Sequence, residues 1–190
     1  MKSLKELYRI GIGPSSSHTM GPRNAAEQFL AKHPDAKSFE VTLYGSLAAT
    51  GKGHMTDTAI IDTLEPHAPL DLKWEPEIFL PFHPNGMLFK SKDENGKVTD
   101  EWTVFSVGGG ALAEEGIDNS ASPDIYEMTK MSQILGWCER TGRSYWEYVQ
   151  QCEESDIWDY LHEVWKTMSE AVERGLEQEG ALPGPLNLRR

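Results

Sequence analysis

Apolar and polar residues alternate along two stretches in the first half of the chain. In SFEVTLYG, which begins at Ser38, every second residue is apolar, and this pattern predicts a half-buried β-strand. Two more alternating runs, within residues 87–110, flank Asn95 and Gly96. This dipeptide suits the positive φ angles of a tight turn, so the pattern predicts a β-hairpin.

Elsewhere apolar residues recur every three or four positions, as they do on one face of a helix. The predicted helices of the first half are residues 2–9, a segment from Thr19 or Pro22 to Ala31, a short turn after Gly45, and residues 56–64 with Thr56 or Asp57 as N-cap. With the strands they predict an α/β fold, in which helices pack on a mixed sheet.

Longer helical segments follow Pro123, over residues 124–142, 144–152 and 156–180. The last has an apolar stripe to bury, made of Ile157, Leu161, Val164, Trp165, Met168, Ala171, Val172 and Leu176. A basic, extended tail follows it. We therefore expect an α/β domain over residues 1–122, a helical extension over 123–180 and a linker over 181–190.

The charge of the chain limits its partners. The formal net charge of −12 repels nucleic-acid phosphates and anionic lipids, and we find no basic patch that would override it. No stretch has the composition of a signal peptide or a membrane span, so a cytoplasmic protein is the simplest expectation. Cys138 and Cys152 are the two cysteines, and they form neither a zinc nor a disulfide framework. We expect no metal site in this chain.

The loop PSSSHT is the first candidate for chemistry. It places Ser15, Ser16, Ser17, His18 and Thr19 at the start of a predicted helix, where unpaired N–H groups and the helix dipole favour an anion. An ordinary N-cap needs one hydroxyl and explains neither the others nor the histidine. We therefore interpret the loop as a site for a carboxylate or phosphate.

A second polar cluster, GKGHMTD, presents Lys52, His54 and Asp57. Its spacing does not fit a phosphate-binding P-loop, which disfavours nucleotide binding. A histidine in a glycine-rich turn can act as a base near neutral pH. The sequence disfavours a hydrolase triad of Ser17, His18 and Asp57, because adjacent Ser and His side chains should not readily reach each other.

Two further clusters leave alternatives open. In PFHPNG, His83 and Asn85 flank a proline, which suits a small polar ligand as well as a structural turn. In SVGGG the three glycines allow a close approach of backbone or ligand, although most such runs are only turns.

Taken in order, IGIGPSSSHTMGP, LYGSLAATGKGHMTD, HPNGMLF and SVGGG resemble the motifs of the beta domain of bacterial iron-sulfur-dependent L-serine dehydratase, an L-serine ammonia-lyase. The resemblance runs from about Leu7 to Gly110 and continues more loosely through the later helices. The tail LPGPLNLRR is similar to the linker that enters the catalytic alpha domain in single-chain members. Departures are Met55 where a glycine is common, Arg23 and Asn24 after GP, and a short segment after Leu64 where relatives carry a longer insertion.

The resemblance implies a role in converting L-serine to pyruvate and ammonia. In that family a [4Fe-4S] cluster, held by cysteines of the alpha domain, acts as Lewis acid on the serine hydroxyl while a base removes the α-proton. The cluster cysteines are absent here, so the chain is expected to be a beta subunit or an N-terminal domain, inactive alone and free of cofactor. L-serine and a catalytic alpha domain or subunit are the implied partners, in a homodimer or an alpha-beta assembly.

The resemblance also implies roles for single residues. His54 is the candidate base, His18 is a second polar contact and the alternative base, and Lys52 and Asp57 would orient His54. The carboxylate would be bound by the hydroxyls of Ser15, Ser16, Ser17 and Thr19.

A regulatory role is the second hypothesis. The family's beta domain resembles the allosteric substrate-binding domain of phosphoglycerate dehydrogenases, and we assign an effector site for serine to His83 and Asn85. The alternative to an enzyme component is thus a stand-alone module that senses serine without catalysis. A helical interaction domain is a third option that leaves the polar loops unexplained.

Overall fold

The computed structural model describes residues 1–117, 123–181 and 188–189. The predicted boundary between residues 122 and 123 and most of the predicted linker over 181–190 lie outside these residues. The domain limits therefore stay a prediction at those two places.

The chain divides into two compact units, which we describe separately. The sheet unit is Gly11–Asn119 with Glu179–Arg190, and the helical unit is Met1–Ile10 with Ser120–Gln178. Residues 1–10 thus group with the later helices, whereas the sequence analysis assigns them to the α/β domain.

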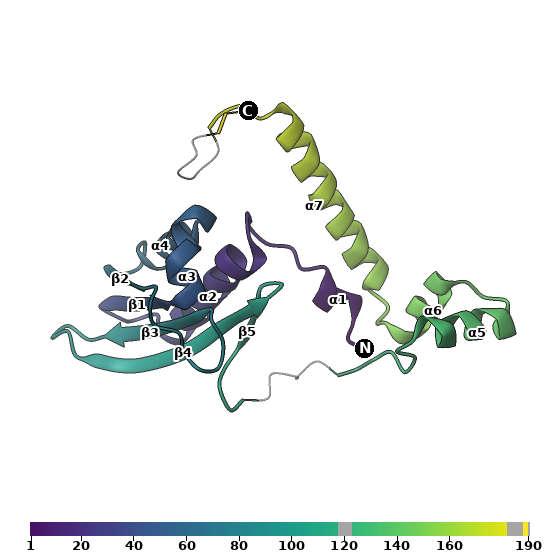
Figure 1. Cartoon of the computed structure of the whole chain (residues 1–190), viewed down its shortest axis with the longest axis horizontal. Helices are drawn as coiled ribbons and strands as arrows, with labels where there is room; N and C mark the ends of the chain where they lie inside the picture. The colour runs from purple at the N-terminus through teal and green to yellow at the C-terminus, as the bar shows by residue number, and fades with distance from the viewer. Residues whose placement is uncertain (118–122, 182–187, 190) are drawn as a thin grey trace. The chain divides into compact units, whose positions relative to one another are not determined.

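A five-stranded mixed sheet forms the base of the sheet unit, with strand order β2-β1-β3-β4-β5 (Figure 1). β1 and β2 are parallel, and the other neighbouring pairs are antiparallel. The strands are β1 (Ser38–Tyr44), β2 (Leu70–Glu75), β3 (Gly86–Lys92), β4 (Val98–Gly108) and β5 (Ala111–Ala113). The predicted mixed α/β class is confirmed.

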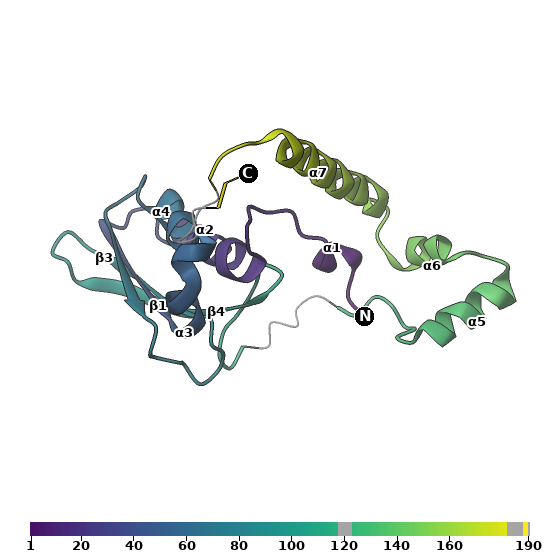
Figure 2. The same ribbon diagram turned by 45° about the horizontal axis from the view of Figure 1, so that its top comes forward.

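Three helices cover one face of this sheet (Figures 1 and 2). They are α2 (Gly21–Lys32), α3 (Gly45–Thr50) and α4 (Thr56–Leu64). A π-helical turn, η1 (Ser16–Met20), leads directly into α2, and a 3₁₀ turn, η2 (Gly51–His54), joins α3 to α4. The chemistry-bearing motifs PSSSHT and GKGH are therefore the turns that begin or join the covering helices.

The core lies between the helices and the sheet because the apolar positions of both point there. Phe29 of α2 packs its ring against Phe39 of β1 and Phe89 of β3, with ring centroids 6.1 and 5.4 Å apart. All three side chains are buried. Burying such aromatic area is the dominant stabilising term of a unit of this size.

The other face of the sheet is charged. Glu40 of β1 pairs with Lys73 of β2 at 2.8 Å and with Lys92 of β3 at 2.7 Å, and Lys90 lies 4.0 Å from the same carboxylate. A strand with one apolar and one charged face explains the strict alternation seen in the sequence.

Several sequence predictions are confirmed and others are wrong. The strand from Ser38, the helices α2 and α4, and the hairpin with Gly96 at φ 75° are present. The N-cap prediction is wrong: Met55, in the left-handed region at φ 58°, precedes α4, and Thr56 is its first residue. The sequence analysis also missed β2 and β5.

In the helical unit, α1 (Leu4–Leu7), α5 (Met131–Thr141), α6 (Tyr145–Cys152) and α7 (Ile157–Glu177) are shorter than predicted. A small core of Tyr126, Trp137 and Tyr148 holds α5 and α6 together. Glu153, just after α6, accepts hydrogen bonds from the Ser3 hydroxyl at 2.6 Å and the Leu4 N–H at 2.7 Å.

The predicted apolar stripe of α7 is only partly buried. Ile157, at its first turn, is 1% exposed. The apolar side chains that are exposed farther along are Trp165, Met168, Val172 and Leu176. None of the described helices is long and apolar enough to cross a membrane.

Candidate functional site

The serine loop, residues 15–19, is fixed by its own hydroxyls. Ser15 caps the π-helical turn, its Oγ accepting from the His18 N–H at 3.1 Å. Thr19 is buried; its hydroxyl accepts from the Ser15 N–H at 3.2 Å and donates to the His54 carbonyl at 2.6 Å. Ser16 is exposed and Ser17 half-buried. Ser15 and Thr19 thus shape the loop, while Ser16 and Ser17 are accessible to a ligand.

His18 lies between two serine hydroxyls. Its Nδ1 is 2.9 Å from Ser17 Oγ, and its Nε2 is 3.2 Å from Ser46 Oγ, at the start of α3. The reason given for setting aside a triad was therefore wrong, because the adjacent Ser17 and His18 do reach each other. The triad itself is not formed: the Asp57 carboxylate accepts from the Thr58 N–H at 2.9 Å, within α4.

His54 packs beside His18, with ring centroids 4.9 Å apart and ring planes inclined by 42°. The contact joins η1 to η2, which are far apart in the sequence. Burial, and next the charge that His54 can carry, lower the pKa of His18, although the hydrogen bond at Ser46 opposes them. His18 is thus held neutral to lower pH than an ordinary histidine.

The orientation of His54 fixes its tautomer. Its Nδ1 lies 2.9 Å from the Thr50 carbonyl oxygen, which can only accept a hydrogen bond. We therefore assign the proton of the neutral ring to Nδ1, and the lone pair to Nε2. A general base needs such an unprotonated nitrogen within reach of the substrate.

Lys52 and Asp57 do not take the positions expected of residues that orient His54. The Lys52 side chain is exposed, with Nζ 5.4 Å from the centre of the Trp74 ring, a cation-π contact. Asp57 is committed to the first turn of α4. Among residues 1–117, the hydrogen bond found at the His54 ring is the one that Nδ1–H donates to the Thr50 carbonyl.

The segment His83–Asn85 reaches the same region. The Pro84 carbonyl accepts from the Ser46 N–H at 3.0 Å, so this segment is bonded to the residue that contacts His18. His83 Nδ1 accepts from the Asn85 N–H at 3.1 Å. Asn85 is buried, and its amide nitrogen donates to the Ser106 carbonyl at 3.1 Å. The four predicted motifs thus converge, although Asn85 is used inside the fold.

Sequence reasoning missed several hydroxyls that hold the serine loop in place. Ser46 contacts the His18 ring, the Thr56 hydroxyl donates to the His18 carbonyl, and the Ser106 hydroxyl donates to the Ser17 carbonyl. All three belong to motifs that the sequence analysis quoted. The alternation along β4 places Ser106 at a buried position of the strand. A buried hydroxyl needs a hydrogen-bond partner, and this is the signal that could have identified Ser106.

The triple glycine makes the turn between β4 and β5. Gly108, Gly109 and Gly110 all have positive φ angles, of 104°, 58° and 75°. These positive φ angles favour glycine, and a Cβ on Gly110 would also lie 2.5 Å from Cε at the flexible end of the Met20 side chain, which belongs to η1.

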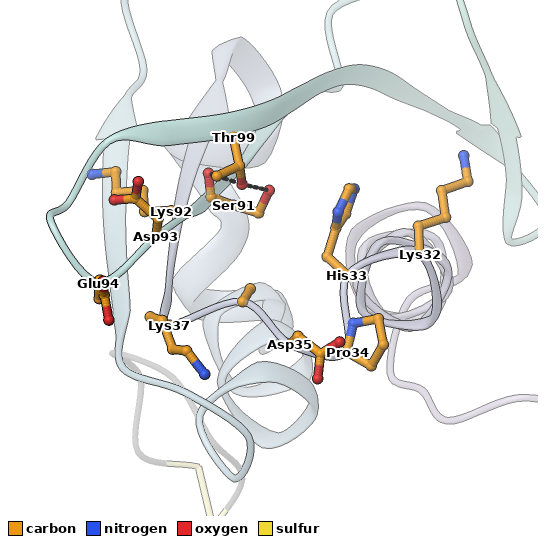
Figure 3. A pocket seen from close by; sticks show the side chains of 11 residues that line it. Lys32, His33, Pro34, Asp35, Lys37, Ser91, Lys92, Asp93, Glu94 and Thr99 are labelled. Atoms are coloured by element: carbon orange, nitrogen blue, oxygen red, sulfur yellow. Dashed lines mark hydrogen bonds between the residues drawn. The ribbon is translucent and has the colours of Figure 1, made fainter.

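A separate cavity of about 430 Å³ lies at the far end of α2, around His33 (Figure 3). Lys32, Lys37 and Lys92 line it together with Asp35, Asp93 and Glu94. His33 Nε2 lies 2.9 Å from the Asp100 carboxylate. None of the predicted site residues lines this cavity.

The chain does not offer the donors of an iron-sulfur cluster. Cys138 and Cys152 lie in α5 and α6 and are half-buried. Within the described residues, no group of three or more His, Cys, Asp or Glu could hold a metal ion. Since a four-iron cluster is bound by several thiolates, these residues do not fit it.

The comparisons agree on one family. The family model described as serine dehydratase beta chain matches residues 3–75 and 67–117. L-serine dehydratase 1 of Escherichia coli is 31% identical over 239 positions, which cover 100% of this chain and 52% of that protein. L-serine dehydratase of Mycobacterium bovis is 34% identical over 236 positions, covering 99% of this chain and 51% of that protein.

The chain spans about half the length of the curated relatives it matches. The alignments have more positions than the 190 residues of this chain, so these relatives carry segments that it lacks. The two ranges that the family model matches overlap at residues 67–75, a stretch that includes β2.

Proposed function

The chain belongs to the serine dehydratase beta-chain family, and from this premise we propose that it is the beta part of an L-serine dehydratase. It would help to eliminate water from L-serine, after which the enamine product hydrolyses to pyruvate and ammonia. The observation that carries the proposal is the contact of the His18 and His54 rings, whose centroids lie 4.9 Å apart, together with the Thr50 carbonyl that holds the proton on His54 Nδ1.

In this proposal His54 removes the α-proton of serine. Its Nδ1–H donates to the Thr50 carbonyl, so the ring keeps its orientation while Nε2 accepts the proton. The lowered pKa of His18 favours its neutral form, so that His18 does not repel the charge that His54 acquires.

The substrate carboxylate would bind at the serine loop. Ser16 and Ser17 offer accessible hydroxyls just before α2, and the N-terminal end of a 12-residue helix favours a negative charge. Lys52 lies in η2 near His54 in sequence and is exposed, so it adds positive potential without a direct bond to the ring.

The cluster expected in the complete enzyme would supply a Lewis acid for the serine hydroxyl. Because the thiols of this chain do not fit it, we assign the cluster to the catalytic alpha part and derive no step through it. The exposed stripe of α7 supports a partner surface, either for that alpha part or for a second copy of the chain.

Replacement of His54 tests the proposed base. In the complete enzyme we expect His54→Ala and His54→Gln to lower kcat by roughly 10²- to 10⁴-fold, the usual contribution of a general base, with a smaller effect on KM. His67→Ala is the matched control, because His67 is exposed and follows α4 outside the site. Near-normal kcat in His54→Ala would show that His54 is not the base.

A serine-sensing role is the second candidate, favoured by the bond between Pro84 and Ser46 that joins the His83–Asn85 segment to the His18 region. Calorimetric titration of the 190-residue chain with L-serine, and D-serine as control, separates the two roles. Saturable, stereoselective binding that His83→Ala abolishes supports an effector site. If no binding is detected, the serine loop and the His54 turn form only part of a serine site, which the alpha part must complete.

A further inference from the structure

Ser106 is fully buried at the end of β4 and is held by Asn85 from both sides. Its N–H donates to the Asn85 carbonyl at 3.0 Å, and its carbonyl accepts from the Asn85 side-chain amide at 3.1 Å. Its hydroxyl is thus aimed in a fixed direction. In that direction it donates to the Ser17 carbonyl at 2.7 Å.

Gly21, the first residue of α2, makes room for this contact. A Cβ at Gly21 would lie 2.2 Å from Ser106 Oγ and 2.9 Å from Ser106 Cβ. The hydroxyl of Ser106 therefore occupies the space that any other residue at position 21 would fill. The glycine of the TMGP stretch is explained by this approach and not by a positive φ angle.

Two other side chains hold the neighbouring residues of the serine loop. The Thr56 hydroxyl of α4 donates to the His18 carbonyl, and the Thr19 hydroxyl donates to the His54 carbonyl. Ser106 is the sheet residue whose hydroxyl holds the serine loop in the same way. The Ser17 carbonyl is partly buried, so losing its donor costs free energy unless the loop moves toward water, and the loop should therefore shift when the Ser106 hydroxyl is removed.

We propose that Ser106, held by Asn85 and admitted by Gly21, is a positioning residue that fixes the Ser17 carbonyl and thereby the Ser17–His18 hydrogen bond. Ser17 Oγ lies 2.9 Å from His18 Nδ1, so a rotation of the Ser17 backbone breaks that bond. Asn85 then acts through Ser106 as a support of the serine loop. The catalytic meaning of this arrangement rests on the proposed function, whereas the positioning itself does not.

The test follows the His18 ring by NMR in the full 190-residue chain, with a pH titration and with His18→Gln to assign the signal. In Ser106→Ala we expect the His18 signals to shift and the pKa of His18 to rise toward the ordinary value of about 6.5, because the loosened ring is more solvated. His54 is the titratable group beside His18, so its signals are followed as well.

Two further variants separate positioning from stability and volume. Ser91→Ala is the matched control: Ser91 is also a buried strand serine bonded to a neighbouring hydroxyl, Thr99 Oγ1 at 2.8 Å, but it lines the cavity at the far end of α2 (Figure 3). Ser106→Cys replaces the hydroxyl by a larger thiol that is only a weak donor. We expect Ser106→Cys to resemble Ser106→Ala, and Ser91→Ala to leave His18 unchanged.

In the complete enzyme Ser106→Ala should lower kcat by about tenfold to a hundredfold, the cost of misplacing a reacting group, and Ser91→Ala by less than about twofold. Unchanged His18 signals in Ser106→Ala, or the same shift in Ser91→Ala, overturn the inference whatever the enzyme activity. The proposed function fails separately, if His54→Ala retains turnover. Shifted His18 signals with lowered kcat support both.

Discussion

Glu40 offers a quantitative test of how the charged face stabilises the sheet unit. Hydrogen bonds from Lys73, and next from Lys92, lower the pKa of Glu40 from 4.5 to about 2. At about 1.4 kcal/mol per pKa unit, such a shift sets an upper limit of roughly 3 to 4 kcal/mol. Since water screens these pairs where the Lys73 side chain is exposed, we expect Glu40→Gln to cost about 1–2 kcal/mol at pH 7.

The lowered pKa of Glu40 fixes the direction in which its stabilising contribution changes with pH. A carboxyl group with a lowered pKa in the folded state stabilises above its unfolded value of 4.5. That contribution is lost as the pH falls through about 2. The difference between the original chain and Glu40→Gln should therefore be constant above about pH 5 and shrink steadily below it.

Hydrogen exchange measured by mass spectrometry on peptides of β1 and β3 is the suitable assay, because it reports on the sheet unit separately from the helical unit. Glu101→Gln is the control, since Glu101 is exposed and lies 3.9 Å from Lys90. A pH-independent difference, or an equal effect of Glu101→Gln, would refute the electrostatic argument.

Two other predictions concern stability. Met55→Gly should raise the thermal unfolding temperature of the sheet unit by the equivalent of about 0.5–1 kcal/mol, because glycine adopts a φ of 58° without the steric cost that methionine has; a lower temperature would contradict this. Burial alone would raise the pKa of Glu153, but hydrogen bonds from the Leu4 N–H and the hydroxyls of Ser3 and Tyr126 lower it. Glu153→Gln should therefore cost the helical unit about 1–2 kcal/mol at pH 7 and progressively less as the pH falls below the unfolded value of 4.5, as measured by urea denaturation followed by circular dichroism; a loss that stays constant in acid would contradict the ionised carboxylate.

The sheet unit was predictable from local patterns where the elements are long or have distinctive turns. Alternation over eight residues and an Asn-Gly turn are sufficient for β1 and for the β3-β4 hairpin. β2 was missed because its six residues, LDLKWE, lie between prolines and half of them are charged. Its alternation of apolar and charged residues is the same period-2 signal as that of β1 and could have identified the strand, whereas its parallel pairing with β1 is a long-range contact that no local pattern contains.

The site was predictable in its members but not in its contacts. The motifs identify His18 and His54 from the chemistry of loops rich in hydroxyls and glycine, whereas their contact requires η1 and η2 to be adjacent in the fold. The Ser17–His18 bond contradicts the expectation that adjacent Ser and His side chains do not readily reach each other. In the π-helical turn the short serine side chain meets Nδ1, the ring nitrogen nearer the backbone.

The membership of Met1–Ile10 in the helical unit has a consequence for biosynthesis. Ser3 leaves the ribosome about 150 residues before Glu153, the carboxylate that binds it. At 5–20 residues per second this wait is roughly 8–30 s, long enough for the strands and covering helices of the sheet unit to fold first. Residues 1–10 thus reach their native partners only after Glu153 is made, so the helical unit is completed after the strands and covering helices of the sheet unit.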